Sequence, residues 1–188
     1  LKNQNRIMSS LTYCFTIMSM LLLFACNEKT GLTFAFMGDI HYEITEGHAT
    51  EKMVLSTANE LAEIKPEPVF FLQTGDFFHG SSGAGVEAEA AFAFSHFRET
   101  IGMPFFVAKG NHDMRNFYEK NALPIFSEEL GRVVSKSYYS FNRTICHFIF
   151  LDCAEQDLRE QLSWLEKDLQ SARSDKKIEH IFAAGHYP

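Results

Sequence analysis

Hydrophobic residues along this chain fall into short dense runs that alternate with stretches of helical spacing. The runs "LTFAFMGDIH", "PVFFLQTGD" and "PFFVAKGNHD" have the length of strands, and each passes into glycine and polar residues. Between them, residues 50–65 and 86–101 carry apolar positions at helical spacing, and we predict that these helices stop at Pro66 and Gly102. Strands that alternate with helices predict a layered α/β domain.

The later part of the chain predicts a hairpin, a helix and a further strand. A loop or short helical region leads to Gly131. The runs "SKSYYSFN" and "TICHFIFLD" are typical of two strands that turn near Asn142 and Arg143. "DLREQLSWLEKDLQSAR" predicts an amphipathic helix, and "KIEHIFAAGH" predicts the last strand. We expect one face of that helix to belong to the core, and its members are Leu158, Leu162, Leu165 and Leu169.

The start of the chain has the pattern of a signal peptide rather than of a folded domain. Lys2 and Arg6 precede the uncharged apolar stretch "LTYCFTIMSMLLLFA", which ends at Cys26. The sequence "LFAC" resembles a bacterial lipobox, so we predict a lipoprotein-type signal peptide at 1–25, lipidation of Cys26 and a tether at 26–31. This places the protein in the bacterial cell envelope, lipid-anchored or secreted. A transmembrane anchor is the alternative, although the stretch is shorter than the roughly 20 residues of a span.

Composition and charge narrow the class of protein further. The chain has 188 residues, enough for one α/β domain, which we place at residues 32–188. The net charge of −7 argues against broad binding of nucleic acid, although a local metal site can still hold an anionic substrate. Cys146 and Cys153 lie at opposite ends of one predicted strand, over about 20 Å apart, so we predict buried free thiols.

Polar side chains gather where four of the predicted strands end. The four endings are "MGDIH", "TGDFFHG", "KGNHD" and "AGHYP", and each places a metal-ligand type of residue after a glycine. Ligands collect at the carboxyl ends of strands in α/β sheets, so four such endings at one edge predict a metal site. Its candidate members are Asp39, His41, Asp76, Asn111, His112 and His186.

The donor types indicate the chemistry of that site. Carboxylate, imidazole and amide donors without cysteine suit Fe, Mn, Zn, Mg or Ni. An aspartate can bridge two ions about 3.5–4 Å apart, and such a pair can clamp a phosphoryl group from both sides. Water bound there loses a proton near neutral pH and becomes a nucleophile. A neighbouring histidine can protonate the departing alkoxide.

The order of these motifs over residues 32–188 resembles the calcineurin-like metallophosphoesterase superfamily. The resemblance implies a four-layer αββα fold, in which a β-sandwich is flanked by helices. It implies a dinuclear metal centre that hydrolyses phosphomonoesters or phosphodiesters, with metal-bound hydroxide as nucleophile. Asp39 and His41 would bind the first ion and Asp76 would bridge both. The second ion would be held by Asn111 and His186.

The same resemblance implies the catalytic residues and one departure from the family pattern. His112 would contact the phosphoryl group and the leaving oxygen, and Asp113 would orient it. The family also carries a later Gly-His-x-His motif that this sequence lacks, because Pro188 stands in the place of the second histidine of "GHYP". We therefore expect a member that lacks the last strands, either as a fragment of a longer gene product or as a truncated protein with an incomplete site.

Three further residues are candidates for contact with substrate or for support of the site. His79 follows the predicted bridging aspartate, Arg115 could bind phosphate, and Asp152 ends a predicted strand. Each has a structural alternative: a loop cap for His79 and Asp152, and a solvated charge for Arg115.

The expected partners are a phosphoester small molecule and a membrane through the lipid on Cys26. A nuclease of the same superfamily is an alternative, but no basic stripe supports nucleic-acid binding. A non-catalytic metal-binding remnant is another alternative.

Overall fold

The computed structural model describes residues 31–42, 49–78, 86–154 and 158–187. These lie almost wholly in one compact unit, Leu32–Pro188. The predicted signal peptide, Cys26 and His79 lie outside the described residues. Within the described ranges, no helix is both long enough and apolar enough to cross a membrane.

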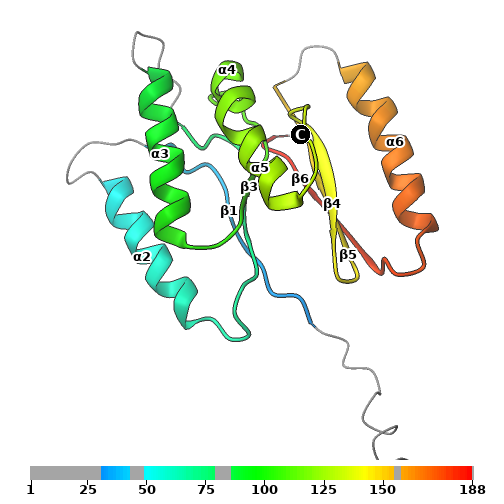
Figure 1. The fold of residues 1–188 in the computed structure, drawn as a ribbon, viewed down its shortest axis with the longest axis horizontal. Helices are drawn as coiled ribbons and strands as arrows, with labels where there is room; N and C mark the ends of the chain where they lie inside the picture. Colours follow the sequence, from blue (N-terminus) through cyan, green and yellow to red (C-terminus); the bar gives the residue numbers. More distant parts are fainter. Residues whose placement is uncertain (1–30, 43–48, 79–85, 155–157, 188) are drawn as a thin grey trace, which may run out of the picture. The chain divides into compact units, whose positions relative to one another are not determined.

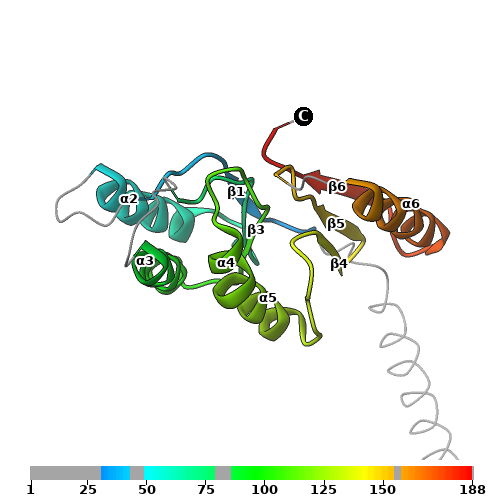
Figure 2. The same ribbon diagram turned by 90° about the horizontal axis from the view of Figure 1, so that it is seen from above.

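Three short parallel strands form the first sheet. Strands β1 (Ala35–Met37), β2 (Phe71–Gln73) and β3 (Phe105–Val107) pair in that order. The connections between them contain α2 (Ala49–Glu63) and α3 (Val86–Ile101), which lie together on one face of the sheet (Figures 1 and 2). The helices begin and end within about two residues of their predicted limits.

The second sheet contains the predicted hairpin and the last strand. Strand β4 (Tyr139–Arg143) pairs antiparallel with β5 (Cys146–Phe150), and β6 (His180–Ala184) pairs parallel with β5. Helix α6 (Leu158–Ser174) joins β5 to β6 and covers the outer face of this sheet (Figure 2). The order helix, sheet, sheet, helix confirms the predicted αββα layers.

Phenylalanine side chains form two parts of the core, one between the two sheets and one between the first sheet and α3. Phe70 contacts Phe148 across the sheets, with ring centroids 5.0 Å apart, and Phe106 contacts Phe141 at 4.5 Å. Their neighbour Phe105 points the other way and packs against α3. Because side chains alternate along a strand, two adjacent phenylalanines serve both faces of one buried sheet. This explains the continuous apolar runs of β2 and β3, whose residues are all buried.

The region between β3 and β4 is helical rather than open loop. Helix α4 (Arg115–Phe117) continues through a π-helical turn (Tyr118–Ala122) into α5 (Leu123–Leu130), which ends at Gly131 with φ 61°. Phe126 of α5 is fully buried and packs against the aromatic core. The sequence signal was weak here because the apolar positions are split over two short helices and an irregular turn.

Some sequence predictions for the second sheet were wrong in detail. The hairpin turns at Thr144 and Ile145, because Arg143 pairs with Cys146 and Thr144 takes the left-handed conformation that tight hairpin turns require. Cys153 is only partly buried, whereas Cys146 is buried; both are free thiols, as predicted.

The leucine face of α6 was also misjudged. Leu158 and Leu162 are exposed at 44% and 58%, while the buried residues of the helix are Gln161 and Ala172. The helix therefore turns a neighbouring face toward the second sheet, where Ser140 donates a hydrogen bond to Asp168. Two of the four leucines predicted as core are not core in the described structure.

Candidate metal centre

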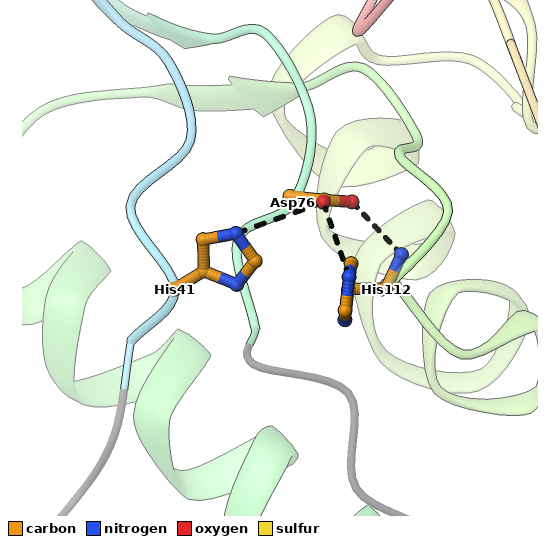
Figure 3. A group of neighbouring side chains, drawn as sticks. All are labelled: His41, Asp76 and His112. Carbon is orange, nitrogen blue, oxygen red and sulfur yellow. Dashed lines mark hydrogen bonds and ion pairs between the residues drawn. The ribbon is translucent and has the colours of Figure 1, made fainter.

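Asp76 lies at the centre of the predicted site. It follows β2 and its side chain is only 3% exposed. Its Oδ2 atom lies 3.0 Å from Nε2 of His186, 3.8 Å from Nε2 of His41 and 3.9 Å from Nε2 of His112. Figure 3 shows two of these imidazoles on either side of the carboxylate. One buried oxygen is thus surrounded by three imidazole nitrogens.

The potential ligand atoms form two groups that share this carboxylate. One group is His41, Asp76 and His112, and the other is Asp39, Asp76 and His186; within each, the ligand atoms lie within 4.8 Å of one another. Asp39 also approaches His41, with Oδ1 and Nε2 3.0 Å apart. The shared position of Asp76 is what a bridging ligand requires. The family resemblance instead implied that Asp39 and His41 bind the same ion, and that His112 is catalytic rather than a metal ligand.

The four strand endings that carry the candidate ligands belong to two different sheets. Asp39, Asp76 and His112 follow β1, β2 and β3 of the first sheet, whereas His186 follows β6 of the second. From the sequence we expected all four strand ends at one sheet edge. The structure shows that they meet because the carboxyl ends of strands from both layers converge.

Three of the candidate ligands occupy unusual backbone conformations. Asp39, His41 and Asp76 have φ angles of 56°, 47° and 52°, in the left-handed region that residues with a side chain rarely adopt. Such conformations cost of order 1–3 kcal/mol each and persist where the surroundings enforce them, commonly at functional sites. The loops are enforced by backbone bonds: Asp39 N–H donates to Gly75, and His41 N–H donates to Asp76.

The Asp113 carboxylate joins the loop that follows β2 to the loop that follows β3. It accepts hydrogen bonds from the backbone N–H groups of Asp76, Phe77, Phe78 and Gly110. Burial raises the pKa of this carboxyl above its ordinary value, and the backbone donors oppose that rise. The carboxylate therefore fixes the backbone that carries the candidate ligands. That Asp113 orients His112 stays a prediction.

His112 stands at the open side of the site, and Asn111 is exposed beside it. The His112 side chain is 39% exposed, and its backbone N–H donates to Oδ1 of Asp76 at 2.8 Å. Its ring lies edge-on to the ring of His41, with centroids 5.0 Å apart. His112 is therefore anchored by its backbone while its imidazole remains accessible.

These residues fit divalent metal ions. Carboxylate and imidazole donors converge from separate strands, and no cysteine belongs to either group. Hard or borderline divalent ions prefer such donors. Three imidazoles also lie close to one buried carboxylate oxygen, and ligands that share a cation must lie close together in this way.

The family is decided by comparison with known proteins. The model of the calcineurin-like phosphoesterase family matches residues 32–188, which include all the residues described above. This chain belongs to the calcineurin-like phosphoesterase family. A comparison with curated proteins gave no significant match.

The calcineurin-like phosphoesterase domain contains a buried ion pair that sequence reasoning missed. Lys109 Nζ lies 3.1 Å and 3.2 Å from the two carboxylate oxygens of Asp152, and both residues are buried. Asp152 also accepts a bond from Ser137. We predicted Asp152 either as support for the site or as a loop cap, and its side chain does accept the N–H of Ala154. No pattern in the sequence identified its partner Lys109.

Beside this ion pair the phosphoesterase domain has a cavity of 310 Å³. Arg115, a predicted phosphate contact, lines it together with Lys109, Lys136 and Asp152. The cavity adjoins the segment that carries His112 but is lined by none of the candidate ligands. Whether Arg115 reaches a substrate stays a prediction.

Proposed function

We propose that this protein is a metal-dependent phosphoesterase that hydrolyses phosphomonoesters or phosphodiesters at a centre of two divalent ions. The observation that carries the proposal is the shared position of Asp76 between two groups of ligand atoms. Membership of the calcineurin-like phosphoesterase family supports phosphoester hydrolysis in general.

The ligand residues divide the binding of the ions between them. Asp39, Asp76 and His186 would hold one ion, and His41 with Asp76 would contribute to the other. Asn111, exposed beside His112, would complete the ligand set. Bound divalent ions supply Lewis acidity toward phosphoryl oxygens and lower the pKa of water.

His112 acts as the general acid in this proposal. Its accessible imidazole can carry a proton to the leaving oxygen, while its backbone N–H keeps the residue attached to Asp76. The partly open position suits contact with substrate better than the 14% exposure of His186 does. Because His112 also belongs to a possible ligand group, the experiment must separate these two roles.

The test is turnover of p-nitrophenyl phosphate and bis-p-nitrophenyl phosphate with Mn²⁺, combined with metal analysis of wild type and His112→Ala. We expect His112→Ala to retain its metal and to lose about 10²–10⁴-fold in kcat, the usual contribution of a general acid. Loss of metal in parallel with activity would instead make His112 a ligand. Full activity of the variant would refute the acid role.

A plasmid-nicking assay with Mn²⁺ distinguishes the nuclease alternative. The net charge of −7 supports a small phosphoester over a nucleic acid, because binding of DNA depends on neutralising phosphates with basic residues. We expect no nicking under conditions that turn over the nitrophenyl esters. Metal binding without turnover of either substrate would favour the non-catalytic alternative.

For location we propose a lipid-anchored protein of the bacterial envelope. The apolar stretch before Cys26 and the sequence "LFAC" support this proposal. Labelling of the protein with a palmitate analogue should depend on Cys26 and be lost in Cys26→Ser. Labelling that persists in the variant would contradict the anchor.

A further inference from the structure

Gln73, the last residue of β2, has a side chain that serves the turn leading to Asp76. Gln73 is fully buried, and its Oε1 accepts the backbone N–H of Gly75 at 2.8 Å. Its Nε2 donates to the carbonyl oxygen of the same Gly75. The amide thus satisfies both backbone polar groups of one residue, which fixes its orientation because neither end can be exchanged. Buried polar groups without such partners would be costly.

Gly75 in turn contacts all three members of one ligand group. The carbonyl oxygen of Gly75 accepts a hydrogen bond from the N–H of Asp39 at 3.2 Å. Gly75 also directly precedes Asp76 in the chain. A Cβ added to Gly75 would lie 2.5 Å from Cβ of His186, so the glycine packs directly against that imidazole. Gly75 has φ 108°, a conformation that residues with a side chain rarely adopt. The position of Gly75 therefore affects Asp39, Asp76 and His186 together.

We propose that Gln73 is a positioning residue for the metal ion held by Asp39, Asp76 and His186. It acts through Gly75 and touches neither the ion nor the substrate. The inference rests on the proposed metal centre and deepens it by assigning a residue that no motif identified. Groups that hold metal ligands in place typically contribute 10–100-fold to metal affinity.

The chain offers a matched control in Gln161. Its side chain makes the same pair of bonds to another backbone residue: Asp152 N–H donates to Oε1 at 2.8 Å, and Nε2 donates to Asp152 O at 3.1 Å. Gln161 is also buried, and it lies on α6, outside both ligand groups. Gln73→Met and Gln161→Met therefore remove equivalent hydrogen bonds with similar changes in volume.

The experiment measures Mn²⁺ affinity of wild type and both variants, by the loss of the free-ion electron paramagnetic resonance signal, together with urea unfolding of the metal-free proteins. We expect both variants to lose similar stability, and only Gln73→Met to weaken Mn²⁺ binding, by about 10–100-fold. Gln73→Glu provides a second variant if Gln73→Met fails to fold. It retains the acceptor for Gly75 N–H but not the donor, so we expect it to weaken binding as well.

Equal Mn²⁺ affinity of wild type and of a folded Gln73 variant would overturn the inference. So would an equal loss of affinity in Gln161→Met, since the effect would then follow general destabilisation. Activity is measured separately: a wild type that binds Mn²⁺ but hydrolyses no phosphoester refutes the proposed function and leaves the affinity result decisive for Gln73. Absence of Mn²⁺ binding by the wild type would overturn both.

Discussion

The two carboxylate oxygens of Asp76 have different neighbours. Oδ1 accepts the backbone N–H of His112, and Oδ2 faces the imidazoles of His41, His112 and His186. One oxygen thus fixes the side chain to a neighbouring loop while the other is presented to the candidate ligands. An amide in place of the carboxylate keeps the size of the side chain and loses its charge.

For Asp76→Asn we expect Mn²⁺ affinity to fall by more than about 100-fold, beyond the effect of residues that only support ligands. Both ligand groups lose their shared anion, so residual binding at one full-affinity site is not expected. Calorimetric titration with Mn²⁺ checks this. A variant that still binds one equivalent with wild-type affinity would show that Asp76 does not bridge.

Tyr118 and Tyr139 give a prediction for alkaline pH. Both phenols donate to the carbonyl oxygen of Val107, and burial raises the pKa of each well above its ordinary value of 10.0. In the unfolded chain these phenols ionise near pH 10.0, whereas the folded protein retains their protons. The folded state therefore binds more protons, and the free energy of unfolding falls as pH rises above that point.

The expected slope is about 1.4 kcal/mol per pH unit for each phenol. Urea unfolding between pH 9 and 11 should reveal it, and the double variant Tyr118→Phe with Tyr139→Phe should lack this component. The variant should also lose about 1 kcal/mol per hydrogen bond at neutral pH. An unchanged slope in the double variant would assign the alkaline loss to other groups.

At the scale of elements, the loops that follow β2 and β3 are in close contact at Gly110. A Cβ at this position would collide with both the carboxylate and the backbone nitrogen of Asp76. Because backbone atoms cannot rotate away as a side chain can, the loop that carries His112 would have to move. Close approach, rather than backbone conformation, explains the glycine here.

Gly110→Ala should accordingly weaken Mn²⁺ binding by about 10-fold or more, as expected when the support of ligands is disturbed. Gly102→Ala is the control: Gly102 has φ 69° with no atom near its Cβ position, so its cost is backbone strain alone, about 1 kcal/mol. Titration of both variants with Mn²⁺ decides the matter. Equal Mn²⁺ affinity of the two variants would contradict a role of this close contact in metal binding.

The sequence predicted the elements better than their faces and partners. Continuous apolar runs located β1 to β3, and proline and glycine stops located the ends of α2 and α3. The signal is strongest for β2 and β3, whose residues are all buried. Glycine followed by ligand-type residues predicted Asp39, Asp76 and His186 as site residues, and the structure brings these three together in one group of potential ligand atoms. Local pattern could not show which face of α6 is buried, nor that Lys109 pairs with Asp152, because both depend on residues distant in the chain.

At the scale of the whole domain, Lys109 and Asp152 connect the two sheets. Lys109 follows β3 of the first sheet, Asp152 follows β5 of the second, and their backbones form an isolated parallel bridge. The ion pair within this connection is buried, with side chains 6% and 1% exposed. Removing one partner from a buried pair strands the other charge, which costs more than the pair itself contributes.

Lys109→Met should therefore destabilise the protein by about 3–5 kcal/mol. The double variant with Asp152→Leu should lose less than the sum of the two single variants, although the bonds of Asp152 to Ser137 and Ala154 are lost as well. A double-mutant cycle by urea unfolding measures this difference. Additive losses would show that the two charges do not depend on each other.

His186 follows a strand of the second sheet, whereas Asp39 and Asp76 follow strands of the first. An ion bound by these three residues would act as a cross-link between the layers, and unfolding would have to release it. At a free Mn²⁺ concentration 100 times the dissociation constant, such a cross-link adds about 2.7 kcal/mol to stability. The melting temperature should then rise with Mn²⁺, fall on chelation, and respond far less in His186→Ala. The proposed catalytic ion would in that case also stabilise the packing of one sheet against the other.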